Sequence, residues 1–139
     1  MKYFVDTNIF LRTAVKDNHQ MLQECKDFFQ EINKESIGLK TSSLVLSEIV
    51  WTLSYFYRFG KSEVVDVLSN VLQTKNLSVI DHYNSELALR LFIQHNVKYI
   101  DALIASIPQV QSGKWTVVSY DRDFDALGIK WVEPGEVVG

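Results

Sequence analysis

The stretch MKYFVDTNIF, residues 1–10, decides the fold, because a short apolar run ends there at three polar residues. Lys2 to Val5 has the character of a strand. Asp6, Thr7 and Asn8 are residue types that favour turns and helix caps. The sequence therefore predicts a strand over 2–5, a helix directly after it, and a carboxylate at the carboxyl end of that strand.

Beyond this stretch the chain alternates between helical and strand-like segments. Helices are expected at 21–32, 44–59, 62–72, 85–95 and 99–107. Strands are expected at 37–40, 77–80, 115–119 and 129–132. Such alternation predicts an α/β fold with a parallel sheet covered by helices on both faces.

Small and polar residues predict where several helices begin and end. Ser42 or Ser43 can cap the helix over 44–59, which is almost wholly apolar and is expected to be central and buried. Gly60 is expected to close it in the left-handed conformation, and Asn96 to close the helix over 85–95 in the same way. Ser62 is expected to cap the helix that follows Gly60.

Composition predicts one globular domain, residues 1–139, with 47% hydrophobic residues. The single cysteine, Cys25, lies in an amphipathic pattern and is expected to be a buried apolar residue without a disulfide. No secretory signal or membrane-spanning stretch is visible, which favours the cytoplasm. A net charge of −3 argues against a broad basic surface for nucleic acid. Bound cations could reverse the local field at an acidic cluster, so net charge alone does not decide.

Four acids stand out by their position in the predicted elements. Asp6 follows the first strand and Asp121 follows the strand over 115–119; if these strands are neighbours, the two carboxylates face one crevice. Asp101 stands among apolar residues, an unusual setting for a carboxylate. Each of these three also has a structural reading as a helix cap or turn residue, and Glu48 could simply face solvent.

Taken together, the acids predict a metal site. Carboxylates held close repel one another, and a cluster persists mainly when protons or cations neutralise it. Ligation by oxygen alone suits Mg²⁺ or Mn²⁺. His19, His82 and His95 lack the spacing of a zinc site, so we interpret them as structural or surface groups.

Four motifs carry a resemblance to a known family: FVDTNIFLR (4–12), SSLVLSEIVWTL (42–53), YIDALIAS (99–106) and VVSYDRDFDALG (117–128). In order, spacing and chain length they resemble the PIN-domain nucleases, especially the small VapC-like ribonuclease toxins of type II toxin–antitoxin pairs. The resemblance implies a three-layer α/β/α domain with a five-stranded parallel sheet. It assigns as catalytic, metal-binding acids Asp6, Glu48, Asp101 and Asp121.

The resemblance also assigns supporting residues. Asn8 and Ser119 would orient carboxylates or water, and Asp123 would be a further acid. The chain departs from the family pattern at two positions. Ser119 stands where threonine is common, which keeps a hydroxyl, and Pro108 is expected to end a helix that usually continues, because proline lacks the amide donor.

The activity implied is hydrolysis of RNA phosphodiester bonds with Mg²⁺ or Mn²⁺ as cofactor. Arg12, Lys98 and Arg122 lie near the motifs and are candidates for contacts with the RNA backbone. The implied partners are RNA, a small antitoxin that fills the acidic cleft, and a second copy of the chain. A candidate pairing surface, which could equally be core, is formed by Trp51, Tyr55, Phe56 and Tyr57.

Two alternatives compete with the nuclease interpretation. An aspartate-dependent phosphatase or phosphotransfer domain would end its first strand in paired acids, whereas Asp6 is followed by Thr7 and Asn8, and no lysine follows the strand over 115–119. A catalytically silent domain that binds only RNA or protein would have lost one or more of the acids. All four acids are present.

Overall fold

A five-stranded, all-parallel sheet forms the centre of the computed structural model, which describes residues 2–138. Its strand order is β3-β2-β1-β4-β5. The strands are β1 (Lys2–Val5), β2 (Gly38–Thr41), β3 (Leu77–Val79), β4 (Trp115–Val118) and β5 (Trp131–Val132). The predicted fold class is confirmed, as is each of the five predicted strands.

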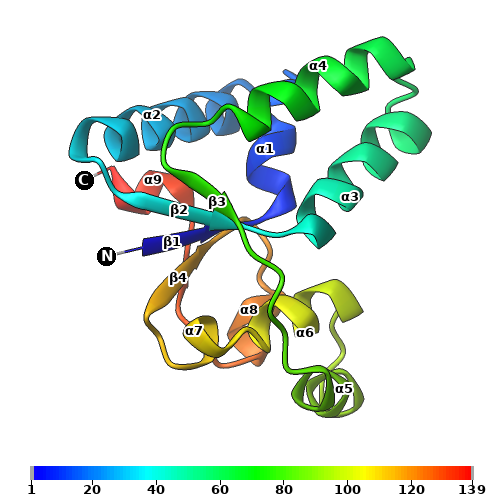
Figure 1. The fold of residues 1–139 in the computed structure, drawn as a ribbon, viewed down its shortest axis with the longest axis vertical. Coiled ribbons are helices and arrows are strands. Elements are labelled where there is room, and N and C mark those ends of the chain that lie inside the picture. Colours follow the sequence, from blue (N-terminus) through cyan, green and yellow to red (C-terminus); the bar gives the residue numbers. More distant parts are fainter. Residues whose placement is uncertain (1, 139) are drawn as a thin grey trace.

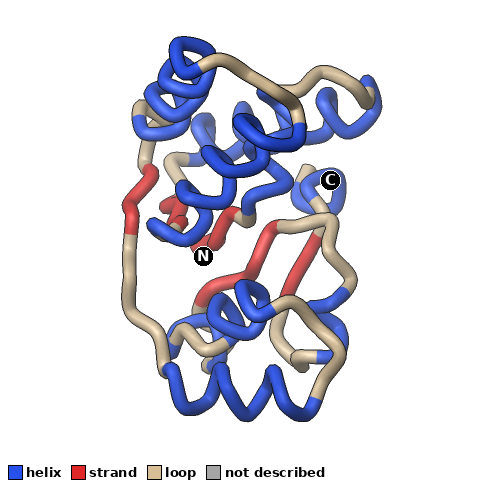
Figure 2. The backbone as a smooth tube through the Cα atoms, turned by 90° about the vertical axis from the view of Figure 1, so that its right-hand side faces the viewer, coloured by secondary structure: helices blue, strands red, loops and turns tan. Residues whose placement is uncertain are grey.

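Helices lie on both sides of this sheet (Figures 1 and 2). The helices are α1 (Thr7–Ala14), α2 (His19–Glu35), α3 (Ser43–Trp51), the π-helix η1 (Thr52–Phe56), α4 (Lys61–Leu72), α5 (Ser85–Gln94), α6 (Tyr99–Ala105), α7 (Pro108–Gln111), α8 (Asp123–Ala126) and α9 (Pro134–Val137). In Figure 1, α1 to α4 lie above the strands and α5 to α8 lie below them. None of the helices among residues 2–138 is long and apolar enough to cross a membrane.

The strand order reverses between β1 and β4, the type of position at which α/β proteins bind ligands. The two strands pair in parallel with Lys2 opposite Trp115 and Val5 opposite Val118. The amide of Asp6 then donates to the carbonyl oxygen of Val118 at 3.0 Å. The residues that follow the two strands are therefore held side by side.

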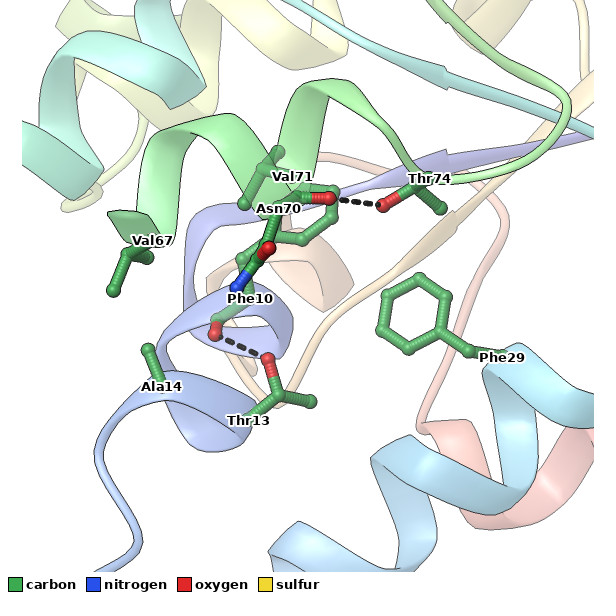
Figure 3. Close-up of a pocket in the computed structure, with 8 residues that line it drawn as sticks. All are labelled: Phe10, Thr13, Ala14, Phe29, Val67, Asn70, Val71 and Thr74. Atoms are coloured by element: carbon green, nitrogen blue, oxygen red, sulfur yellow. Dashed lines mark hydrogen bonds between the residues drawn. The ribbon is translucent and has the colours of Figure 1, made fainter. Parts of the chain in front are cut away.

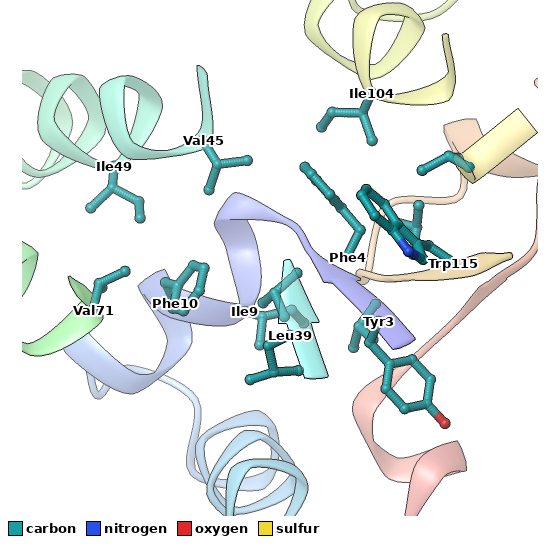
Figure 4. Close-up of a cluster of buried hydrophobic side chains, with 14 of the residues drawn as sticks. Tyr3, Phe4, Ile9, Phe10, Leu39, Val45, Ile49, Val71, Ile104 and Trp115 are labelled. Carbon is teal, nitrogen blue, oxygen red and sulfur yellow. The ribbon is translucent and has the colours of Figure 1, made fainter. Parts of the chain in front are cut away.

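Apolar side chains from the sheet and the helices form the core (Figure 4). Phe4 on β1, Leu39 on β2 and Ile104 on α6 are almost completely buried. Their removal from water stabilises the fold by roughly 2 kcal/mol per large side chain. Cys25 is buried and free, as expected.

The apolar segment after Ser42 differs from its prediction. Ser42 caps α3 as expected, but the α-helix ends at Trp51 and continues as the π-helix η1. The predicted burial is wrong for three of its aromatic residues, because the exposed fractions are 61% for Trp51, 67% for Tyr55 and 70% for Phe56. These side chains form a surface of the molecule.

Three predicted helix ends are also wrong. Arg58, at φ 59°, takes the left-handed conformation expected of Gly60, which is extended and is the N-cap of α4. Glu63 reaches back to accept the amide of Gly60 at 3.1 Å, so the cap forms there and not at Ser62. Asn96 is not left-handed, since α5 ends at Gln94 followed by an extended residue.

Pro108 ends the preceding helix, as predicted. Helix α6 stops at Ala105, and Pro108 is the first residue of the separate short helix α7. Proline is tolerated at a first helical position because the missing amide has no partner there anyway. The departure at Pro108 thus lies in the segment between α6 and β4.

Candidate metal centre

A hollow of about 200 Å³ lies at the reversal of strand order. Its lining combines two acids, a lysine and small polar groups. The lining residues are Asp6, Thr7, Asn8, Leu11, Glu48, Thr52 and Lys98. Glu48 therefore faces this hollow from α3, which answers the question of whether it points away into solvent.

Asp6 is held at the end of β1 by short hydrogen bonds. Its Oδ1 accepts the amide of Thr7 at 2.8 Å, so it caps α1, as the sequence pattern suggested. Its Oδ2 accepts the hydroxyl of Ser119 at 2.7 Å. The residue is 4% exposed, so its carboxylate is fixed in place rather than free in solvent.

Ser119 and Asn8 connect the end of β1 to the end of β4. Besides donating to Asp6, the Ser119 hydroxyl accepts the side-chain amide of Asn8 and the backbone amide of Asp121, each at 3.0 Å. The Asn8 carbonyl oxygen accepts the amide of Tyr120 at 3.1 Å. These contacts position the loop that carries Asp121.

Three acids form a compact cluster beside the hollow. Asp101, Asp121 and Asp123 each offer one carboxylate oxygen, and these atoms lie within 4.8 Å of one another. Asp101 is the third residue of α6 and is buried, so it does not act as the helix cap. The amide of Asp123 donates to Asp121 Oδ1 at 2.9 Å, which orients that carboxylate.

Lys98 supplies positive charge to the cluster. Its Nζ lies 2.8 Å from Asp121 Oδ2 and 3.8 Å from Asp101 Oδ2. The side chain is 59% exposed, whereas that of Asp101 is 2% exposed. Lys98, one of the three candidate RNA contacts, is thus an ion-pair partner of the acids in this structure.

Burial and mutual repulsion shift the ionisation of the acids. Burial, reinforced by the charge of Asp6, raises the pKa of Asp101 to about 9, with Lys98 acting in the opposite direction. Burial likewise raises the pKa of Asp6 to about 6, although hydrogen bonds from Ser119 and Thr7 act to lower it. Burial also acts to raise the pKa of Asp121, but the hydrogen bonds from Lys98 and the Asp123 amide, together with the charge of Lys98, outweigh burial, and the pKa is lowered.

One buried carboxylate oxygen of the cluster has no hydrogen-bond donor, and a bound cation would satisfy it. Asp101 Oδ2 is buried and accepts no hydrogen bond from the residues described here. A buried acceptor without a donor is costly, and carboxylate oxygens are the ligands of hard divalent ions. The residues present therefore fit a divalent cation held by Asp101 together with Asp121 and Asp123.

The other predicted site residues lie outside the acidic hollow. Arg12 forms an exposed ion pair with Asp17 at 3.2 Å and lines a smaller hollow of about 70 Å³ together with Asn8, Leu11 and Tyr57. Arg122 is exposed on the loop between Asp121 and Asp123. Among the described residues, the acidic cluster contains no histidine.

Tyr120 and Glu24 belong to the support of the site but were missed by sequence reasoning. The Tyr120 hydroxyl donates to Glu24 Oε1 at 2.8 Å, which ties the loop after β4 to α2. The position of Tyr120 between Ser119 and Asp121 was a usable signal. Glu24 gave none, because it lies 96 residues away in a helix with ordinary amphipathic spacing.

A second hollow, of about 210 Å³, has different chemistry. Figure 3 shows its lining from α1, α2 and the α4 region, with Phe10, Phe29 and Val71 among the side chains. Its lining contains no ionisable group. This hollow offers no carboxylate to a hard cation, so the acidic cluster is the better candidate for a metal site.

These features define a parallel α/β domain with an acidic pocket at its reversal of strand order. The model of the PIN domain family matches residues 3–130, and the chain belongs to this family. The family resemblance seen in the motifs is confirmed. Membership also argues against the phosphotransfer alternative.

Relatives cover nearly the whole chain. A protein named VapC ribonuclease in Aquifex aeolicus (strain VF5) is 24% identical over 132 residues, which are 95% of this chain and 96% of the relative. VapBC2 of Rickettsia felis, solved bound to a DNA fragment from its promoter, has a TM-score of 0.72 at 21% identity, covering 96% of this chain and 98% of that one. A sarcin-ricin loop cleaving VapC toxin of Mycobacterium tuberculosis has a TM-score of 0.67 at 21% identity, covering 95% and 99%.

Proposed function

We propose that this protein is a metal-dependent endoribonuclease that hydrolyses RNA phosphodiester bonds and serves as the toxin of a toxin–antitoxin pair. The observation that carries this proposal is the gathering of three carboxylate oxygens, from Asp101, Asp121 and Asp123, within 4.8 Å of one another beside the hollow that Asp6 and Glu48 line. PIN family membership and the similarity to named VapC ribonucleases support the same activity.

The acids divide into two roles by their surroundings. Asp101, Asp121 and Asp123 would ligate Mg²⁺ or Mn²⁺ directly, because Asp101 Oδ2 has no hydrogen-bond donor among the described residues. Asp6 already accepts hydrogen bonds at both oxygens, so it would add negative charge and fix the loop after β4. When bound, such an ion polarises a phosphate and lowers the pKa of a water molecule.

Glu48 is the best placed group to take a proton from the attacking water. It lines the hollow beside Asp6 and Lys98 and lies outside the cluster of three ligand atoms. A general base must reach the reacting water while remaining free of other strong partners. Asp101 is less suited to this step, because one of its carboxylate oxygens belongs to the cluster of three ligand atoms.

The smaller hollow lies next to the acidic one, and an arginine and a tyrosine are among the residues that line it. It shares Asn8 and Leu11 with the acidic hollow and adds Arg12 and Tyr57. Single-stranded nucleic acid is commonly bound by aromatic rings that stack on bases and by cations that contact phosphates. We propose that Arg12 and Tyr57 bind a nucleotide next to the scissile bond, with Arg122 near the backbone.

Two protein partners are proposed as well. A small antitoxin would insert a basic side chain into the acidic hollow, where it would meet the carboxylates of Asp6 and Glu48.

A second copy of the chain would cover the exposed aromatic residues Trp51, Tyr55 and Phe56, since exposed apolar patches commonly mark interaction sites. Light scattering of wild type and Phe56→Glu tests the pairing; a dimer is expected only for wild type.

Cleavage of a labelled single-stranded RNA tests the proposed activity. Wild type is expected to cut with Mg²⁺ or Mn²⁺, while EDTA abolishes cutting and Asp101→Asn lowers the rate about a hundredfold or more. Asp66→Asn, an exposed aspartate on α4, is the matched control and should cut like wild type. Cutting that survives both EDTA and Asp101→Asn would overturn the metal mechanism, and RNA binding without cutting by wild type would favour the catalytically silent alternative.

A further inference from the structure

Lys98 is a cation already in contact with the proposed metal ligands. Its Nζ is 2.8 Å from Asp121 Oδ2 and 3.8 Å from Asp101 Oδ2. Two of the three ligand residues of the cluster thus share one ammonium group. The buried oxygen left without a hydrogen bond, Asp101 Oδ2, is the atom that Lys98 approaches without reaching hydrogen-bond distance.

The ammonium group is held by charge more than by packing. Lys98 precedes the first residue of α6 and makes no side-chain cap of that helix. Its side chain is 59% exposed, so it can leave the cluster by rotating into solvent. A four-carbon stem ending in a compact, well hydrated charge permits that movement at low cost.

The charge balance explains why a cation is needed there. Asp6, Glu48, Asp101 and Asp121 all act on Lys98 or on one another through their charges. Without a counter-charge, buried carboxylates at these distances would repel strongly. A divalent ion would satisfy the same oxygens with twice the charge, and it would then repel the ammonium group.

We infer that Lys98 is an internal competitor for the divalent ion: its ammonium group neutralises Asp121 and lies beside Asp101 in the metal-free protein, and it must be displaced when the ion binds. This inference rests on the proposed function, since it requires the acidic cluster to be the metal site. Lys98 thereby weakens metal binding while it stabilises the metal-free fold. Once displaced, the ammonium group remains at the rim of the hollow, where an incoming phosphate would meet it.

Binding of Mn²⁺, measured by the electron paramagnetic resonance signal of the free ion, tests this inference without any RNA. Lys98→Met keeps the apolar stem and removes the charge, and it is expected to bind Mn²⁺ about tenfold more tightly than wild type at low ionic strength. Lys98→Arg keeps the charge and should remain within about threefold of wild type. Lys26→Met, which removes an exposed lysine on α2, is the control for net charge.

A second readout is thermal unfolding in EDTA. In EDTA, Lys98→Met should melt at a lower temperature than wild type, because the variant has lost the ammonium group beside the acids. Added Mn²⁺ should raise its melting temperature by more than that of wild type. Affinity of Lys98→Met equal to or weaker than that of wild type would overturn the inference alone. If Asp101→Asn bound Mn²⁺ as tightly as wild type, the cluster would not be the metal site, and the proposed function would fall with the inference.

Discussion

Asp6 combines two roles that the sequence pattern presented as alternatives. It caps α1 through Thr7, and it also lies on the acidic hollow beside Glu48. Both roles follow from its position between a strand and the helix that comes directly after it. A carboxylate that caps this helix lies at the edge of the sheet where the parallel strands end, and ligands bind at that edge. A structural reading of such a residue therefore does not exclude a functional one.

Asp101 is expected to reduce the stability of the metal-free protein. Its pKa is raised to about 9, so at pH 7 the carboxyl is protonated in the folded protein and ionised in the unfolded chain, and the proton uptake on folding costs stability. Asp101→Asn, which is neutral without taking up a proton and keeps nearly the same shape, should increase the free energy of unfolding in EDTA by about 1–3 kcal/mol. Urea denaturation at pH 7 measures this change in unfolding free energy, and a loss of stability would contradict the raised pKa of Asp101.

Ser119 is expected to hold Asp6 and Asp121 in position through its hydroxyl group. Ser119→Ala removes the donor to Asp6 and the acceptor of the Asp121 amide, leaving buried polar groups unpaired at a cost of about 1–3 kcal/mol. Ser119→Thr keeps the hydroxyl and should restore stability and Mn²⁺ affinity to near wild-type values. Equal defects in the two variants would show that side-chain volume matters here, rather than the hydrogen bonds.

At the scale of elements, the strand ends were the part of the site that sequence could predict. Asp6 and Asp121 follow apolar runs, and parallel pairing of β1 with β4 brings those ends together. Asp101 was recognisable as a charge in an apolar helix, but its direction depends on how α6 packs. Lys98 could not be assigned to the acids by any local pattern, because its partner Asp121 lies on a distant loop.

The π-helix η1 shows why the segment after Ser42 was mispredicted. Its apolar composition resembles that of a buried helix, and nothing local specifies the bonds from Tyr57 to Thr52 and from Phe59 to Leu53. The wider turn and the left-handed Arg58 then redirect the chain. Such bulges depend on tertiary packing and occur frequently at functional sites.

Tyr120 links α2 to the loop that carries Asp121. Tyr120→Phe removes the hydroxyl that donates to Glu24 and keeps the ring, so it should cost only about 1 kcal/mol of stability. Because the loop loses an anchor, Mn²⁺ affinity should fall several-fold. Tyr83→Phe, which removes an exposed hydrogen bond to Asp81, is the control; equal Mn²⁺ affinity in both variants would contradict the positioning role.

At the scale of the whole molecule, net charge and composition were weak guides. A net charge of −3 argued against nucleic-acid binding, yet five of the acids responsible for it lie at or beside one hollow. The distribution of charge, not its sum, decides what such a surface binds. That distribution depends on the strand order, which alternation of elements alone does not specify.

The metal-free protein is expected to lose stability as the pH rises. The pKa values of Asp6 and Asp101 are raised to about 6 and about 9, above the ordinary value of 3.8. Their contribution to stability is fully present below that value and is lost as the pH rises through the folded-state values. The unfolding free energy in EDTA should thus decline from pH 5 to pH 9. The increase in unfolding free energy on adding Mg²⁺ should grow over the same range, since carboxylate ligands must be deprotonated to bind the ion. A flat or rising profile in EDTA would contradict these shifts.

Anomalous diffraction at the manganese edge, from crystals grown with Mn²⁺, locates the bound ion directly. We expect a peak with oxygen atoms of Asp101 and Asp121 about 2.0–2.6 Å away, and the ammonium group of Lys98 withdrawn from both. A peak elsewhere, or none at these carboxylates in Mn²⁺-saturated crystals, would contradict this expectation.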